Sequence, residues 1–273
     1  MKRFTLFLLA VTASWAQPHS TVEPTFLKRA LPAPKVYSNN CQWKPLFGES
    51  DAEARVARGV IRYWVVDVNM TGEPCKTPVH PDEEQVAVVL SGEGRLEYAG
   101  QKLDLKPHDF VYLPEGGERS FRGQLRIILM GFRVVEGPGQ REALKANWDD
   151  VKLQQVGNHP PSTLYRLMMG DLKSTRDRIA AGKVLTSLYI MEFAPGGTNA
   201  PHHHDNEEEI YLLLSGAGEM VAGGGVDGTE NRIAVKPGDA FFFRMNCTVG
   251  FYSAPTQKSV ILAVRSLYPR RNR

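Results

Sequence analysis

The 273-residue sequence has few cysteines, little net charge and no long apolar run. Three cysteines are too few for a disulfide-dense mini-protein. A formal net charge of +3 is too small to indicate a nucleic-acid partner. No apolar stretch reaches the roughly 18 residues of an ordinary transmembrane helix. With 42% hydrophobic and 23% charged residues, the composition is that of a globular protein and excludes a disordered chain.

Helical periodicity is also scarce, and 50–58 and 140–150 are the best helix candidates. The 25 glycines and 18 prolines instead favour turns between strands. β-Branched and aromatic residues gather in short, regularly spaced runs, which we expect to form antiparallel strands of an all-β protein. These runs are 60–68, 85–90, 94–98, 110–113 and 125–132 in the first half, and 164–169, 184–193, 209–214, 218–221, 240–244 and 259–264 in the second.

Residues 1–16 have the order of a secretion signal. Lys2 and Arg3 precede an apolar stretch, 4–11, and the small-residue site Ser14-Trp15-Ala16 follows it. A basic start, an apolar middle and small residues before the cleavage point are typical of such signals. We therefore predict cleavage after Ala16 and a secreted or periplasmic protein with no membrane partner after cleavage. A buried N-terminal helix is the alternative.

Export implies an oxidising compartment, in which cysteines can form disulfides. Cys41, Cys75 and Cys247 allow one disulfide within a monomer and leave one thiol over. Cys41 and Cys75 lie in the same half of the chain, so we expect them to pair. Three separately buried thiols are the alternative.

An internal repeat divides the chain. Leu90-Ser91-Gly92-Glu93-Gly94 recurs 124 residues later as Leu214-Ser215-Gly216-Ala217-Gly218, and Lys106-Pro107-His108-Asp109-Phe110 recurs 130 residues later as Lys236-Pro237-Gly238-Asp239-Ala240. The six extra residues fall in the glycine-rich turn 222–228, where an insertion is tolerated. A repeat of this length indicates a duplicated domain. We therefore predict domains at 17–150 and 151–273.

The second repeat contains the pattern Gly196-x5-His202-x-His204-x4-Glu209-x6-Gly216. Because residues i and i+2 of a strand point to the same side, His202 and His204 face one way and His203 the other. Glu209, on the next strand, can bring its carboxylate to the same point. Two imidazoles and one carboxylate are a ligand set for a divalent first-row metal, and three ligands leave positions open for water or substrate.

This pattern and the downstream turn Pro237-Gly238-Asp239 together resemble the two conserved motifs of the cupin superfamily. Because the pattern is duplicated, the chain resembles a bicupin over essentially its whole mature length. The resemblance implies two tandem jelly-roll β-barrels with a few short helices. It also implies Fe, Mn, Zn, Ni or Cu held inside a barrel by three histidines and a glutamate, a small-molecule substrate or ligand, and assembly into a homo-oligomer.

The sequence departs from the cupin pattern in both repeats. The second motif would place another histidine where Val249 stands, so the expected ligands are His202, His204 and Glu209. Loss of the metal together with the fourth ligand is the alternative. In the first repeat, alignment sets Pro78, His80 and Gln85 opposite the three ligands and Arg119 opposite Val249. We expect that barrel to bind no metal and Arg119 to pair with Glu83 or Glu84, with anion binding by Arg119 as the alternative.

Three functions are consistent with this pattern. The first is a metal-dependent enzyme of dioxygenase, decarboxylase, isomerase or hydrolase type, with an oxidoreductase favoured and Tyr211 as a substrate contact or proton donor. The second is a non-catalytic small-molecule or sugar-acid binder with a vestigial metal site, and the third is a storage protein. We expect Glu207 and Glu208 to be solvated loop charges, and the aromatic run 241–243 to pack in the core.

Overall fold

The computed structural model describes residues 26–34, 40–49, 58–70, 72–134, 139, 141–223 and 231–267. The predicted signal peptide lies outside these residues, as does nearly all of the predicted helix 50–58. Within the described ranges, no helix is long and apolar enough to cross a membrane.

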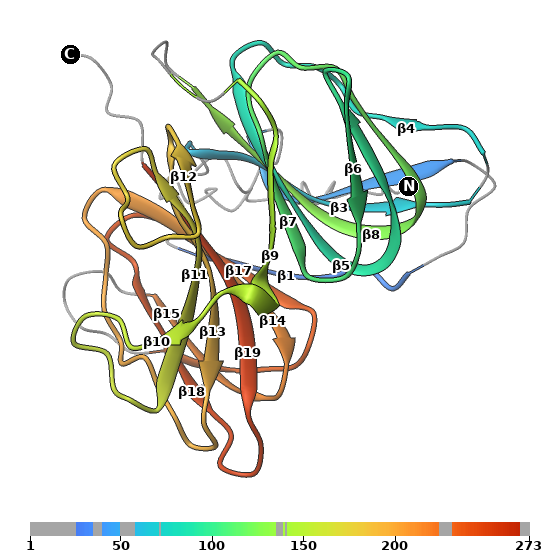
Figure 1. The fold of residues 1–273 in the computed structure, drawn as a ribbon. Coiled ribbons are helices and arrows are strands. Elements are labelled where there is room, and N and C mark those ends of the chain that lie inside the picture. The colour runs from blue at the N-terminus through green and yellow to red at the C-terminus, as the bar shows by residue number, and fades with distance from the viewer. Residues whose placement is uncertain are drawn as a thin grey trace, which may run out of the picture.

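The first half of the chain forms one antiparallel eight-stranded sheet (Figure 1). Its main path runs β2-β3-β8-β5-β7-β9, with β4 paired to β8 and β6 paired to β5. The strands are β2 (Cys41–Gly48), β3 (Val60–Val68), β4 (Cys75–Lys76), β5 (Glu83–Tyr98), β6 (Gln101–Leu105), β7 (Asp109–Leu113), β8 (Arg119–Arg133) and β9 (Leu144–Asn147).

The second half forms an eight-stranded sheet and a three-stranded sheet. The larger sheet runs β1-β17-β14-β19-β13-β11-β10 with β12 paired to β11, and the smaller one runs β16-β15-β18. These strands are β1 (Phe26–Ala30), β10 (Leu153–Gln154), β11 (Thr163–Asp171), β12 (Ile179–Gly182), β13 (Leu185–Phe193), β14 (Glu207–Ser215), β15 (Gly218–Gly223), β16 (Asn231–Val235), β17 (Asp239–Phe243), β18 (Thr248–Ser253) and β19 (Ser259–Leu267). The predicted all-β jelly-roll class is confirmed, although hydrogen bonding leaves the sheets open.

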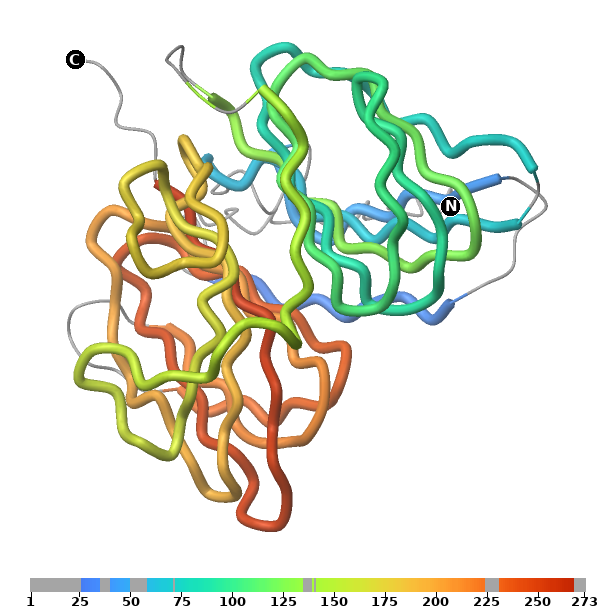
Figure 2. Tube along the Cα trace, viewed as in Figure 1, coloured from blue at the N-terminus to red at the C-terminus, as the bar shows by residue number. Residues whose placement is uncertain are grey.

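The strand β1 belongs to the sheet of the other half. It pairs antiparallel with β17, with Phe26 opposite Phe243 and Ala30 opposite Asp239. Figure 2 shows this blue segment running beside the orange strands of the second half before the chain enters the first sheet. The edge of the second sheet is therefore closed by residues that the sequence division assigns to the first domain.

The central strands of the two large sheets are buried on both faces, because one face packs against the other half and the opposite face packs in the core of its own half. In β5, Val86 and Val88 face the apolar layer between the halves, while Ala87 and Val89 face the core of the first half. In β14, Ile210 and Leu212 face the shared layer, and Tyr211 and Leu213 face the core of the second half. This double burial explains why these strands have nearly continuous apolar runs instead of alternation.

The predicted helix 140–150 is wrong. Its residues form β9, which pairs with β7, and then a single 3-10 turn, Trp148–Asp150. The Asn147 side chain accepts a hydrogen bond from the Asp149 N–H and donates one to Asp109. Pairing with β7 therefore outweighs the weak local helical preference. Within the described ranges, this turn is the only helical element.

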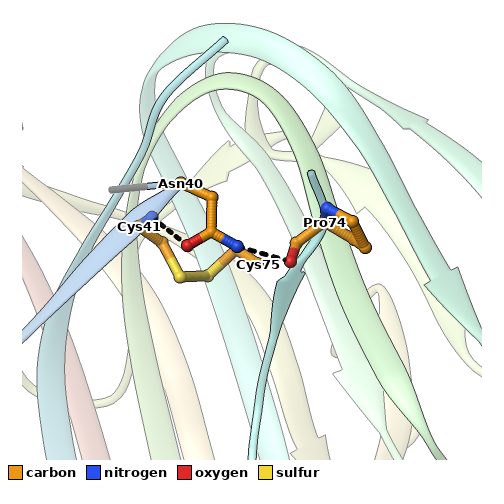
Figure 3. Close-up of a disulfide and its surroundings, with 4 residues drawn as sticks. All are labelled: Asn40, Cys41, Pro74 and Cys75. Carbon is orange, nitrogen blue, oxygen red and sulfur yellow. Dashed lines mark hydrogen bonds between the residues drawn. A yellow bond between two sulfur atoms is a disulfide. The ribbon is translucent and has the colours of Figure 1, made fainter. Parts of the chain in front are cut away.

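The expected disulfide joins Cys41 and Cys75, whose Cα atoms lie 5.4 Å apart (Figure 3). Asn40 organises the bridge, because its side chain accepts a hydrogen bond from the Cys41 N–H and donates one to the Pro74 carbonyl. The bridge connects the start of β2 to β4 within the first sheet. Cys247 is buried in the second half, where its thiol contacts the Gly223 carbonyl.

Candidate metal centre

The histidine-containing motif folds as a loop that leads into β14. His202 forms an isolated bridge with Val249, and His204 lies just before the strand that carries Glu209. The two bracketing glycines have backbone conformations that other residues rarely adopt, with φ +71° at Gly196 and +91° at Gly216. Gly196 therefore lets the chain turn before the histidines, and Gly216 lets it turn where β14 ends.

The structure brings the three predicted ligands together. One potential ligand atom from each of His202, His204 and Glu209 lies within 4.8 Å of the others. The His204 Nε2 and Glu209 Oε2 atoms are 3.3 Å apart, and both are buried with no hydrogen-bond partner. Buried polar atoms without partners are costly, and these are of the type that binds first-row divalent ions. The donor set therefore fits a metal ion.

Glu209 is held as an anion at the base of this cluster. Tyr189 donates a hydrogen bond to Oε1, and the Arg265 Nε lies 4.0 Å from the same oxygen. Burial opposes ionisation, but the rings of His204 and His202 and the charge of Arg265 outweigh it and lower the pKa of Glu209 to about 2. Because Tyr189 donates its hydrogen bond to Oε1, Oε2 is the oxygen of Glu209 that is available to bind an ion.

The histidines differ in accessibility and in their hydrogen bonds. The His202 Nδ1 lies 2.9 Å from the Ala200 carbonyl, and burial lowers the pKa of His202, which favours the neutral ligand form. His203 is exposed and lies 3.1 Å from Asp205. The prediction that His203 faces away from its neighbours is confirmed, although these residues form a loop rather than a regular strand.

A cavity of about 120 Å³ opens over the ligand cluster. Tyr211 is buried on its wall, two residues after Glu209, and its hydroxyl accepts a hydrogen bond from the Asn199 amide at 3.2 Å. Burial and the charge of Glu209 raise the pKa of Tyr211, so the side chain remains a phenol. Further lining residues, which the sequence did not single out for this site, are His159, Tyr165, Arg176, Tyr189 and Arg265.

The position of the usual fourth ligand is apolar. Val249 is buried in the core of the second half, and its main chain exchanges two hydrogen bonds with His202, at 2.8 and 2.9 Å. Phe241 and Phe243 pack in the same core, while Phe242 packs in the layer between the halves. The expectation that this aromatic run packs in the core is confirmed.

Arg119 in the first half forms no close ion pair with Glu83 or Glu84, although the charge of Glu83 acts against burial, which lowers the pKa of Arg119. Arg119 is only 3% exposed and donates one hydrogen bond, to the Pro78 carbonyl at 3.4 Å, whereas Nε and Nη1 are buried without partners. Arg62 pairs with Glu83 instead, at 2.8 Å. Gln85 also donates to Glu83, at 2.6 Å, and the aligned His80 is half-buried.

The expectation of solvated charges at Glu207 and Glu208 fails for Glu208. Glu208 is fully buried and accepts main-chain hydrogen bonds from Arg58, Gly59 and Val60. Its side chain points to the opposite face of β14 from Glu209, toward the other half of the molecule. Glu207 is partly buried and pairs with Arg265 at 3.1 Å.

Comparison with known proteins agrees with this architecture. The cupin domain family model matches residues 55–128 and 189–264, which together make up more than half of the chain. Comparison with curated protein sequences gives no match.

Several solved structures share the fold. A putative glyoxylate-induced protein from Pseudomonas aeruginosa has 17% identity and a TM-score of 0.66, covering 86% of this chain and 83% of its own. The protein Ylba from E. coli has 16% identity and a TM-score of 0.65, covering 92% and 95%. The oxalate decarboxylase of Lactobacillus farciminis, solved as a formate complex, has 12% identity and a TM-score of 0.66, covering 92% and 88%. The two matched segments and the shared fold show that the chain belongs to the cupin domain family and contains two cupin repeats.

Proposed function

We propose that the protein is a metal-dependent enzyme that acts on a small organic molecule in its second cupin repeat. One observation carries the proposal: His204 Nε2 and Glu209 Oε2 are buried without partners beside His202, under a cavity of about 120 Å³. When bound, a divalent ion supplies a Lewis acid or activates water or dioxygen at positions that the protein leaves open. His202, His204 and Glu209 would hold it.

The surrounding side chains define how a substrate is bound. The cavity of about 120 Å³ is large enough for a small organic molecule. Arg176 and Arg265 on its wall favour an anionic group. The Tyr211 hydroxyl, which already accepts from Asn199, directs its own proton toward another acceptor and serves as a hydrogen-bond or proton donor. The similarity to an oxalate decarboxylase supports small carboxylic acids as the first substrates to screen.

Metal content tests the proposal. Elemental mass spectrometry of reconstituted protein is expected to give about one divalent ion per chain, and a His202→Ala, His204→Ala double variant is expected to lose it. Less than about 0.2 ion per wild-type chain contradicts a metalloenzyme. A substrate panel under aerobic and anaerobic conditions then separates oxygen chemistry from decarboxylation, hydrolysis and isomerisation. Tyr211→Phe is expected to lower kcat without changing the metal content.

A binding protein without catalysis is the second candidate. The apolar side chain of Val249 at the fourth ligand position favours it, because this position in the centre contributes no donor. Stoichiometric ligand binding with no turnover across the panel supports this function.

We also propose that the protein is exported. The order of residues in the predicted signal supports export, and so does the Cys41–Cys75 disulfide, since such bridges persist in oxidising compartments. N-terminal sequencing of the protein from the periplasm or the medium is expected to begin after Ala16. A full-length N-terminus on cytoplasmic protein contradicts export.

A further inference from the structure

A third histidine lies beside the ligand cluster, although it belongs to neither cupin motif. His159 is in the turn between β10 and β11, more than 40 residues before His202 in the sequence. Its ring lines the same cavity as His202 and His204. The ring centroids of His159 and His202 are 5.2 Å apart, with the planes inclined at 66°.

His159 is anchored in the way that metal-binding imidazoles are anchored. Its Nδ1 lies 2.7 Å from the Asn199 carbonyl, and since a carbonyl only accepts, Nδ1 carries the proton. The lone pair is therefore on Nε2. His202 has the same arrangement, with Nδ1 2.9 Å from the Ala200 carbonyl. A carbonyl that fixes the tautomer and orientation of the ring is the usual support of a histidine ligand.

The spacing of the rings matches a shared ion. Two imidazoles that bind one metal through Nε2 at about 2.1 Å hold their ring centroids about 4.5–5.2 Å apart, for coordination angles of about 90–109°. His202 and His204 are 4.9 Å apart by this measure, and His159 and His202 are 5.2 Å apart. The cluster within 4.8 Å contains His202, His204 and Glu209 but not His159. His159 can therefore bind the same ion only if its ring moves toward the other three residues.

We propose that His159 is the fourth protein ligand of the metal and supplies the imidazole that Val249 cannot. This inference rests on the proposed metal site. The second repeat then has three histidines and one glutamate, but one histidine comes from the turn before β11 instead of the second motif. Because His159 approaches from the cavity wall, its coordination also narrows the side from which a substrate reaches the ion.

Cobalt(II) titration tests the assignment without reference to activity. The exchangeable Nδ1 protons of histidines that ligate Co²⁺ give strongly shifted proton NMR signals. We expect His159→Gln to lack one such signal that the wild type shows and to bind Co²⁺ at least about tenfold more weakly in competition with a chelator. His203→Ala is the matched control, because His203 is exposed and faces away from the cluster, and it should bind as the wild type does.

The outcomes separate this inference from the proposed function. If the wild type and His159→Gln show the same shifted signals and the same affinity, His159 is not a ligand, while the metal site stands. If the wild type itself binds no Co²⁺, the metal site and the role of His159 are both overturned. Circular dichroism and thermal unfolding of the variant identify any loss of binding that comes from misfolding.

Discussion

Glu84 and Glu208 occupy equivalent positions in the two repeats, 124 residues apart, and each binds the main chain of the other half. The Glu84 carboxylate accepts hydrogen bonds from the N–H groups of Lys183, Val184 and Leu185, at 2.8–3.1 Å. Glu208 accepts from Arg58, Gly59 and Val60, at 2.8–3.3 Å. Both carboxylates are fully buried. Each therefore fixes the entry of a strand, β13 or β3, that belongs to its pseudosymmetric partner.

Removing either carboxylate should destabilise the whole protein. Glu84→Ala and Glu208→Ala each leave about three main-chain donors without an acceptor, and we expect a loss of at least about 3 kcal/mol in the free energy of unfolding. Urea unfolding measures this change. The control is Glu49→Ala, which removes a more exposed ion pair with Arg133 and should cost less than about 1 kcal/mol. Similar losses in all three variants would contradict the role of the buried pair.

Stability should fall between about pH 4.5 and 7 because of Glu208. Burial raises its pKa from 4.5 to about 7, although the three N–H donors act in the opposite direction. In this window the folded protein keeps a proton that the unfolded chain has released, so the free energy of unfolding decreases as the pH rises, by at most about 1.4 kcal/mol per pH unit. Glu208→Gln should show a shallower slope when urea midpoints at pH 5 and 7 are compared. An identical slope in both proteins refutes this assignment.

The Cys41–Cys75 bridge should stabilise the first half substantially. It closes a loop with a sequence separation of 34 residues, for which chain entropy predicts about 3–4 kcal/mol. Cys41→Ala, Cys75→Ala is expected to lower the melting temperature, and a reducing agent should affect the wild type but not the variant. Equal melting temperatures of the oxidised wild type and the variant contradict this prediction.

Replacing Arg119 should raise stability, which is unusual for a buried residue. Arg119 is 3% exposed, and two of its guanidinium nitrogens have no hydrogen-bond partner. Burial lowers the pKa of Arg119, and the single hydrogen bond to Pro78 and the charge of Glu83 offset only part of this cost, whereas an apolar side chain of similar length keeps the packing. Arg119→Met is therefore expected to raise the urea midpoint. A lower midpoint would show that Arg119 makes a stabilising interaction.

Tyr189 should raise the metal affinity of the site by orienting Glu209. Its hydroxyl donates to Glu209 Oε1, so Tyr189→Phe removes a hydrogen bond that orients the carboxylate. We expect metal affinity to fall about 10- to 100-fold in a chelator competition. Tyr165→Phe is the matched control, because Tyr165 lines the same cavity and packs against Tyr189, yet donates no hydrogen bond to a predicted ligand. Equal losses in both variants would assign the effect to packing.

Local pattern was enough to predict most of the central strands. The run 60–68 coincides with β3, and each of the other predicted runs lies within, or within one residue of, an observed strand. The runs 85–90 and 94–98 form one strand, β5. A register shift after Val89 and the left-handed conformation of Gly92 let the strand continue where a turn between the two runs was expected. By contrast, β1 has only five residues and pairs with a strand from the far end of the sequence. No pattern in its own residues therefore predicts a strand there.

Only those residues of the candidate site that lie close together in the sequence could be predicted from it. His202, His204 and Glu209 lie within eight positions, and their spacing predicts that they share one site. His159, Tyr189 and Arg265 reach the same cavity from three other segments, and Arg265 lies one residue beyond the predicted run 259–264. Their convergence depends on the register of β13 and β19 and on the path of the turn before β11, which single-sequence patterns do not determine.

The exchange of β1 between the halves has a consequence for how the chain reaches its native state. Phe26 pairs with Phe243, more than 200 positions later, so β1 leaves the ribosome long before its partner exists. Because closing such a long loop costs entropy before any contact forms, this pairing belongs late in folding. The sheet of the second half cannot be completed from residues of the second repeat alone, and β1 must wait as an unpaired segment until β17 has been synthesised. The last sheet to be completed therefore joins residues made early in synthesis to residues made near its end.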